Sequence, residues 1–348
     1  MAMNTTTARG QVTIKEVAER AGVSLMTVSR VVNGRGRVKD TTRDKVQAAI
    51  RELNYRPNIM ARRLAGGGSL FIGIIYHNPS PGYLSKVLDG ALRACRIFGH
   101  HLVIDDMGGV TPNDDNYREV AESLHKAGLD GVIITPPLSH NRDLVDALTA
   151  LKIACVRVAP GNIFTETLRV AMDDTKAVHE MIDYLITQGH TRIGFIKAPE
   201  RSKTCALRYA GYLSALKDNN ILPDPDLVID GEFTYRSGMD GAYKLLSLSE
   251  RPTAIFASND DMAAGVIAAA NMRGLTVPDD LSVAGFDDTE IATSIWPELT
   301  TIRQPIAQMA EQAVSLITDS VTGSSIAKDD NQALLEFDIV KRGSVKKL

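Results

Sequence analysis

Residues 12–34 read VTIKEVAERAGVSLMTVSRVVNG, and this stretch predicts two short helices joined by a tight turn. Thr13 and Glu16 have the spacing of a capping box, after which apolar residues recur at helical intervals. Gly22 permits the turn, and Ser24 is a suitable cap for the second helix. The side chains predicted to bury where the two helices cross are Ala18, Val23 and Val28. This pattern is typical of a helix-turn-helix.

A third helix is predicted over residues 41–53. Pro57 ends the helical pattern, because proline disfavours a helical conformation at the residue before it. Asn58 is a suitable cap for a short segment at 59–65, and GGGS at 66–69 is typical of a flexible linker. The predicted organisation is a disordered tail at 1–11, a helix-turn-helix domain at 12–57, a hinge and linker at 58–69, and a larger domain at 70–348.

Charge is distributed unevenly along the chain. Residues 1–65 contain 13 Lys and Arg and 5 Asp and Glu, a net charge of +8, whereas the rest of the chain has a net charge of −11. A polyanion would therefore be attracted to the N-terminal segment and repelled by the remainder. The alternative is a purely structural three-helix domain with a solvated basic face. The positive charge and the polar start of the second helix favour DNA binding over that alternative.

The start of the second predicted helix carries the side chains that would meet a major groove. Arg30 can bond a guanine edge through two hydrogen bonds, and hydroxyl groups can contact phosphates. Leu25 and Met26 offer only apolar contact, for which thymine methyl groups are the matching partner. The predicted DNA contacts in this region are Thr13, Ser24, Leu25, Met26, Thr27, Ser29, Arg30 and Asn33.

The pattern changes after residue 69. Short apolar runs, such as 71–76 and 131–135, alternate with amphipathic stretches, such as 86–98 and 116–127. Runs that are apolar on both faces are typical of parallel strands covered by helices. There are more of these units than one small sheet needs, so the sequence predicts an α/β domain of two lobes. Such folds bind ligands at the carboxyl ends of their strands.

The composition argues against an exported or membrane protein. Apolar residues make up 44% and charged residues 23%, as in ordinary globular proteins. Cys95, Cys155 and Cys205 lie far apart, which is typical of free thiols in a reducing compartment. No apolar run is long enough to span a bilayer, and the polar N-terminus lacks the apolar centre of an export signal. We therefore expect a cytoplasmic, nucleoid-associated protein, and the C-terminus shows no coiled-coil heptads.

Residues 12–34 and 41–67, the latter reading TTRDKVQAAIRELNYRPNIMARRLAGG, closely resemble the lactose-repressor/galactose-repressor (LacI/GalR) family. The resemblance implies a homodimer that reads two half-sites of a near-palindromic operator in double-stranded DNA. It also implies that residues 58–65 form a hinge helix on DNA, in which a leucine enters the minor groove as a wedge. The contacts that it adds are Asn58, Ala61 and Leu64.

The resemblance continues through the larger domain. The matching stretches are IGIIYHNPSPGYL (72–84), GHTRIGFIKAPERSKTCALRYAGY (189–212), PTAIFASNDDMAAGV (252–266), LSVAGFDDTEIAT (281–293) and PELTTIRQPI (297–306). The family fold implies a sensor of two flavodoxin-like or Rossmann-like lobes, of the periplasmic-binding-protein type, with chain crossings near Leu168, Thr300 and Ser325. Lobe 1 would comprise about 70–167 and 301–325, and lobe 2 about 168–300 and 326–344.

The resemblance also points to ligand contacts. By position, Arg208, Asn259 and Asp287 match residues that hold sugar hydroxyls in family members, and their hydrogen-bonding groups suit that task. Phe233 matches an aromatic floor that can lie against the C–H face of a sugar. Further cleft positions are His77, Tyr83 and Ser139. The structural alternatives are an ion pair for Arg208, a turn cap for Asp287, a helix cap for Asn259 and a core position for Phe233.

Residues 201–204, RSKT, do not reproduce the pocket pattern of the purine repressor, which favours a sugar or short oligosaccharide as the ligand. The resemblance thus implies a sequence-specific repressor of carbohydrate-utilisation genes that a sugar releases from its operator. The opposite response, to a corepressor, stays open. The half-site sequence also stays open, because the family's best-known member has polar-capable readers where this chain has Leu25 and Met26.

Two other function classes account for fewer of these features. The pairs at 260–261 and 287–288, all aspartates, could serve acid–base catalysis as in glycoside hydrolysis, but adjacent carboxylates on one chain usually point apart. The sequence shows no phosphate loop, nucleophile elbow or histidine-rich metal set, so we expect neither enzymatic activity nor a cofactor or metal. A transporter's solute-binding protein would share the two lobes but would need an export signal and no DNA-binding module.

Overall fold

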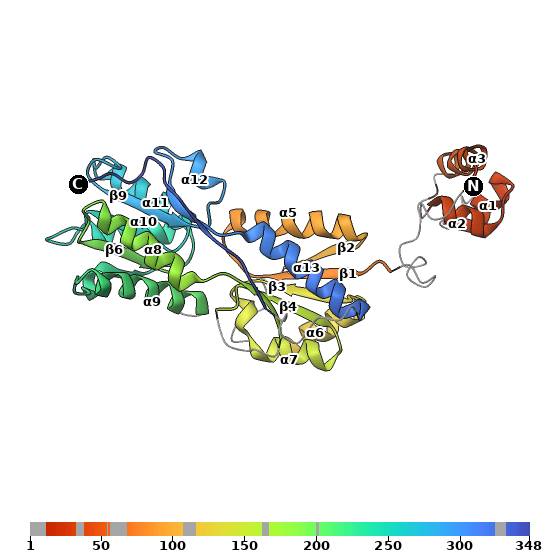
Figure 1. Cartoon of the computed structure of the whole chain (residues 1–348), viewed down its shortest axis with the longest axis horizontal. Coiled ribbons are helices and arrows are strands. Elements are labelled where there is room, and N and C mark those ends of the chain that lie inside the picture. Colours follow the sequence, from red (N-terminus) through yellow and green to blue (C-terminus); the bar gives the residue numbers. More distant parts are fainter. Residues whose placement is uncertain are drawn as a thin grey trace, which may run out of the picture. The chain divides into compact units, whose positions relative to one another are not determined.

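The structure is a computed structural model that describes residues 12–32, 38–53, 55, 68–106, 116–161, 167–199, 202–323 and 332–348 (Figure 1). The chain forms two compact units, Met1–Ser69 and Leu70–Leu348. Each unit has a hydrophobic core of its own. Among the described residues, no helix has the length and apolar character needed to cross a lipid bilayer.

The described part of the N-terminal unit forms the helices α1 (Ile14–Ala21), α2 (Leu25–Val32) and α3 (Asp40–Glu52). The predicted capping box is confirmed: Thr13 Oγ1 accepts a hydrogen bond from the Glu16 backbone N–H at 3.4 Å, and the Glu16 carboxylate accepts one from the Thr13 backbone N–H at 2.6 Å. Gly22 ends α1 with φ 65°, a left-handed conformation that favours glycine. One fully buried valine from each helix lies in the core: Val17, Val28 and Val46.

The first lobe of the C-terminal unit is a parallel six-stranded sheet with the strand order β11-β5-β4-β3-β1-β2. Its strands are β1 (Phe71–Tyr76), β2 (His101–Asp106), β3 (Gly131–Ile134), β4 (Ala154–Val158), β5 (Leu168–Ala171) and β11 (Gln332–Leu334). Its helices are α5 (Pro81–Phe98), α6 (Tyr117–Lys126), the 3-10 turn η1 (Leu138–His140), α7 (Arg142–Ala150) and α13 (Ile306–Thr322). Successive strand residues face opposite sides, so Ile74 packs with α5 and α13, whereas Ile75 packs with α6 and α7.

The second lobe is a six-stranded sheet with the order β12-β10-β9-β8-β6-β7, in which only β12 is antiparallel to its neighbour. Its strands are β6 (Ile193–Lys197), β7 (Val228–Asp230), β8 (Ala254–Ala257), β9 (Ser282–Phe286), β10 (Thr300–Arg303) and β12 (Asp338–Val340). Its helices are α8 (Asp174–Thr187), α9 (Lys203–Asp218), η2 (Pro225–Leu227), α10 (Tyr235–Leu245), α11 (Asp260–Met272) and α12 (Ile291–Ser294). Helices α8 and α9 cover one face and α10 and α11 the other. The predicted two-lobed α/β architecture is confirmed.

The chain crosses between the lobes at residues 172–173, 304–305 and 335–337. The expected crossings, near Leu168, Thr300 and Ser325, all lie earlier in the chain. The reason is that a short strand completes a sheet before each crossing: β5 pairs with β4, β10 with β9, and β11 with β5. The lobe limits therefore move, and residues 168–171 and 332–334 belong to lobe 1 while 301–303 belong to lobe 2.

Helices α5 and α13 approach each other closely at Gly90. A Cβ atom at this position would lie 2.0 Å from the carbonyl oxygen of Ala307, a backbone atom that cannot turn aside. We expect Gly90→Ala to lower the free energy of unfolding by about 1–3 kcal/mol, measured by urea denaturation. The control is Asp89→Ala on the exposed side of α5, for which we expect a change below about 0.5 kcal/mol. Equal stability of the two variants would contradict the close helix contact.

Candidate ligand pocket and nucleic-acid interface

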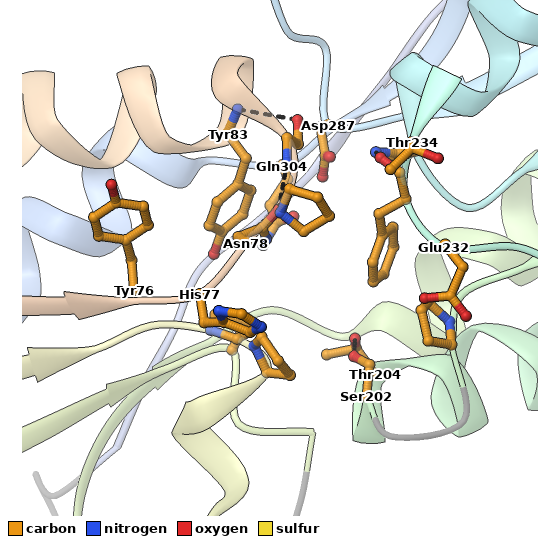
Figure 2. Close-up of a pocket in the computed structure, with 18 of the residues that line it drawn as sticks. Tyr76, His77, Asn78, Tyr83, Ser202, Thr204, Glu232, Thr234, Asp287 and Gln304 are labelled. Atoms are coloured by element: carbon orange, nitrogen blue, oxygen red, sulfur yellow. Dashed lines mark hydrogen bonds between the residues drawn. The ribbon is translucent and has the colours of Figure 1, made fainter. Parts of the chain in front are cut away.

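A cavity of about 400 Å³ lies at the carboxyl ends of strands from both sheets (Figure 2). Tyr76 ends β1, Asn259 follows β8, Asp287 follows β9 and Gln304 follows β10, and all four line the cavity. Parallel strands present their carboxyl ends at one edge of a sheet, so side chains far apart in the sequence meet there. The predicted ligand contacts that line the cavity are Arg208, Asp287, Asn259, Phe233, His77 and Tyr83.

Arg208, on α9, is 5% exposed and is held by groups on three sides. Its Nε donates to Asp174 Oδ1 at 2.8 Å, and its Nη1 donates to the carbonyl oxygen of Ser258. Its guanidinium carbon lies 3.5 Å from the centre of the Phe286 ring. The structural alternative, an ion pair, is therefore present at the cavity wall. Within the described residues Nη2 has no hydrogen-bond partner, so one corner of the guanidinium remains for a ligand.

Asp287 lies in a strained loop. Its φ is 108°, which L side chains rarely adopt, and its backbone N–H donates to the carbonyl of Ile302 at 2.8 Å. Burial raises the pKa of the Asp287 carboxyl well above its ordinary value, and the Arg208 guanidinium opposes this shift. The carboxyl makes no hydrogen bond with any other described residue, so the turn-cap alternative is not observed. Asp288 anchors the loop instead, because its carboxylate accepts hydrogen bonds from Arg303 at 2.7 Å and Arg342 at 2.6 Å.

Asn259 caps helix α11, as the structural alternative predicted. Its Oδ1 accepts from the Met262 backbone N–H at 2.9 Å, and its Nδ2 donates to the carbonyl of Phe233 at 3.0 Å. Both ends of the amide are therefore used within the protein, although Asn259 lines the cavity. Phe233 is half-buried and has a φ of 58°. The bond from Asn259 thus holds the backbone that carries the aromatic ring.

The prediction for Ser139 is not supported. This residue lies in η1, is 1% exposed and is not among the described residues that line the cavity. Its hydroxyl donates to the carbonyl oxygen of Ala159 at 3.5 Å, because the turn directs it toward the backbone that follows β4.

Gln304 is the main cavity residue that was not predicted. It is 2% exposed, its Nε2 lies 3.5 Å from Met309 Sδ, and its Oε1 is buried without a partner in the described part of the chain. The Tyr83 hydroxyl is also buried and without a partner there. An unpaired buried polar atom costs about 1–3 kcal/mol, which a ligand that supplies the missing bond would recover. The signal that could have found Gln304 is its place directly after a strand, at the same edge as Asp287.

Helix α2 presents exposed apolar side chains at its start. Leu25 is 49% exposed and Met26 is 64% exposed. The Ser24 hydroxyl accepts from the Thr27 backbone N–H at 3.2 Å and so caps the helix, and Arg30 is exposed in its last turn. Of the other predicted DNA contacts, Thr13 takes part in the capping box and Ser29 is half-buried. The predicted contacts that lie outside the described residues are Asn33, Asn58, Ala61 and Leu64.

Known proteins resemble the chain along nearly its whole length. The family model described as bacterial regulatory proteins, lacI family, matches residues 13–58, and that of a periplasmic binding protein-like domain matches residues 182–345. The HTH-type transcriptional repressor PurR of Mannheimia succiniciproducens is 32% identical over 342 residues, which cover 97% of this chain and 99% of that protein.

Two solved structures have the same fold. The lac repressor dimer bound to operator and the anti-inducer ONPF has a TM-score of 0.80 and 29% identity, over 97% of this chain and 99% of that chain. The complex of the transcriptional regulator CelR with cellobiose has a TM-score of 0.72 and 26% identity, over 96% of this chain and 100% of that chain.

Proposed function

The chain belongs to the lacI family of bacterial regulatory proteins and is a DNA-binding transcriptional repressor, and from this premise we propose that a sugar releases it from its operator. The sugar or short oligosaccharide binds in the cavity, and the regulated genes serve carbohydrate use. The observation that carries this proposal is the pairing of two unpartnered buried atoms, Tyr83 Oη and Gln304 Oε1, with aromatic Phe233 around one cavity. A sugar can place hydroxyl groups against the two unpartnered atoms and a C–H face against the Phe233 ring. The CelR–cellobiose complex supports this ligand class.

In this proposal, the exposed side chains of α2 read the operator sequence. Arg30 bonds a guanine edge, and Leu25 and Met26 contact thymine methyl groups. The lac repressor binds its operator as a dimer, so we assign a homodimer here too, with one copy on each half-site. A repressor of this kind works in the cytoplasm, where the chromosome lies.

Contacts between the lobes at the cavity rim offer a route from ligand to DNA. Ser80 Oγ of lobe 1 donates to Asp261 Oδ2 of lobe 2 at 2.5 Å, and Lys86 Nζ of lobe 1 donates to the carbonyl of Asp288. Because Asp288 is adjacent to Asp287, a ligand bound at Asp287 acts on the lobe 2 loop that contacts Lys86 of lobe 1. The lobes then rotate and change the spacing of the hinge segments in the dimer. A coupling of ~1–3 kcal/mol changes operator affinity ~5–150-fold.

This function predicts a selective defect for Asp287→Ala. Duplexes that bind the full-length protein are first selected from random DNA, and their release is measured with neutral mono- and disaccharides, including cellobiose. We expect Asp287→Ala to bind the selected duplex normally and to need at least about tenfold more sugar for release, because it loses a hydrogen-bonding carboxyl. The control is Asp240→Ala, which removes an exposed carboxyl from α10. No preference for any duplex over random competitor would refute the function, and normal release of the Asp287→Ala variant would remove Asp287 from the site.

A further inference from the structure

Carboxyl groups lie at or close to the lobe 2 side of the cavity. Asp287 lines it, and Asp174, Asp260 and Asp261 are near enough to influence the ionisation of Asp287. Among the described cations, Arg208 is the one that lowers the pKa of Asp287, whereas the three carboxyls raise it. Its charge is already matched, because its Nε lies 2.8 Å from Asp174 Oδ1 and both side chains are buried. Two of the four carboxyls, Asp174 and Asp287, therefore share this guanidinium.

Neutral groups hold two of these carboxyls. Asp260 accepts hydrogen bonds from Thr301 Oγ1 at 2.6 Å and from the Thr289 backbone N–H at 2.7 Å. Asp261 accepts hydrogen bonds from Ser80 Oγ at 2.5 Å and from Asn259 Nδ2 at 3.4 Å. Neither carboxyl has an ion-pair partner in the part of the chain that the structure describes. Burial raises the pKa of Asp260 to about 7, so this carboxyl is charged mainly above neutral pH, where it would repel a further anion nearby.

The unpartnered atoms of the cavity are mostly acceptors. Gln304 Oε1 can only accept a hydrogen bond, and the Asp287 carboxyl can likewise only accept once it is ionised, which burial shifts to higher pH. The Tyr83 hydroxyl can do either. Among the buried groups of this wall, Arg208 offers one remaining corner as a donor. Half-buried lining residues, among them His77 and Asn78, can also donate. A ligand that satisfies the buried acceptors must therefore bring donors, and an anionic group would be repelled by the ionised Asp287 carboxylate.

We infer that the effector is rich in hydrogen-bond donors and carries no negative charge, so that the cavity accepts a neutral or amine-bearing sugar and rejects sugar phosphates and uronic acids. This inference rests on the proposed function of the cavity as the effector site. Hydroxyl and ammonium groups share the required donor chemistry. An ammonium group would in addition favour the charged forms of Asp287 and Asp260. A phosphate would meet Asp287, and the described cation that acts on this carboxyl, Arg208, is already paired with Asp174.

The quenching of a tryptophan placed in the cavity by charged solutes reports the electrostatic potential of the cavity. The chain has one natural tryptophan, Trp296, which is 86% exposed, so the full-length double variant Trp296→Phe/Phe233→Trp has a single reporter at the cavity. Its fluorescence is quenched at pH 8 with cesium, iodide and neutral acrylamide. We expect the cesium-to-iodide ratio of quenching constants to exceed that of free N-acetyltryptophanamide by on the order of fivefold, because a negative potential concentrates cations and excludes anions.

Matched variants identify the source of that ratio. Adding Asp287→Asn to the reporter chain is expected to lower the ratio at least about twofold, whereas Glu250→Gln, an exposed carboxyl in a distant turn, leaves it unchanged. A ratio at or below that of the free compound overturns the inference, as does a ratio insensitive to Asp287→Asn. If Phe233→Trp disturbs the fold by circular dichroism, Tyr76→Trp supplies a second reporter from the lobe 1 wall.

Four sugars then test the ligand class with the same reporter. For each sugar, the measurement is whether it protects the cavity tryptophan from quenching by acrylamide. Protection by glucose supports the inference for a neutral sugar. Protection by glucosamine supports it for an amine-bearing sugar. Protection by glucose 6-phosphate or glucuronate overturns it. A sugar phosphate that released the protein from selected DNA would uphold the proposed function and refute this inference alone, so the two failures are distinguishable.

Discussion

Replacing Arg208 with alanine is expected to lower the free energy of unfolding by about 3–5 kcal/mol. The variant leaves the Asp174 carboxyl, which is 3% exposed, without the guanidinium that lies 2.8 Å away. Burial already raises the pKa of Asp174 and Arg208 holds it down, so the carboxyl of the variant must either remain charged without a partner or take up a proton. The loss should therefore be larger at pH 8 than at pH 5. Urea denaturation at both values measures it.

Two further variants separate the buried pair from a surface effect. Arg236→Ala removes an exposed arginine from an ion pair on α10 and is expected to cost less than about 0.5 kcal/mol. The double variant Arg208→Met/Asp174→Leu removes both charges and is expected to recover most of the stability lost by Arg208→Ala, because the Asp174 charge is removed together with its partner. If Arg208→Ala were as mild as Arg236→Ala, Arg208 would not compensate a buried charge.

Replacing Arg30 with alanine is expected to weaken binding to the selected operator by about 10–100-fold per half-site, with little change in binding to random DNA. The reason is that a bidentate contact to guanine discriminates between bases, whereas a phosphate contact does not. Arg30 is exposed, so its loss should leave the unfolding transition unchanged. Fluorescence anisotropy with selected and random duplexes at fixed salt measures the ratio of the two affinities.

Lys45→Ala is the charge-matched control, because it removes one exposed positive charge from α3 instead of α2. We expect it to weaken binding to selected and random duplexes alike, and to reduce the salt dependence of both. Arg30 would be a backbone contact, and not a reader of sequence, if the two variants lowered the two affinities in the same proportion.

The helix-turn-helix unit was predictable because its signals act between close neighbours. Thr13 and Glu16 cap α1 at a spacing of three residues, and Gly22 adopts the left-handed conformation that the turn requires. The lobe crossings were predicted less well. Strand β11 has only three residues, and its place beside β5 depends on a pairing with a segment much earlier in the chain. Such pairing leaves little local pattern.

The cavity residues also divide into features that the sequence predicted and features that it did not. The rule that ligands meet strand ends, together with the family resemblance, brought out Arg208 and Asp287, and both line the cavity. Neither source predicted that the Asn259 amide would hold the Phe233 backbone as well as cap α11, or that the Ser139 hydroxyl would face a backbone carbonyl. Those outcomes depend on hydrogen-bond partners that come from other segments.

By itself, the sequence determined the helix caps, the separation of positive from negative charge along the chain, and the alternation of strands and helices, because each depends on nearby residues or on their number. The tertiary structure was needed to show that the Arg208 guanidinium acts on both Asp174 and Asp287, and that Gln304 and Tyr83 have buried atoms without partners among the described residues. Burial and proximity arise only when distant strand ends meet, and they set the electrostatics on which the choice of ligand depends.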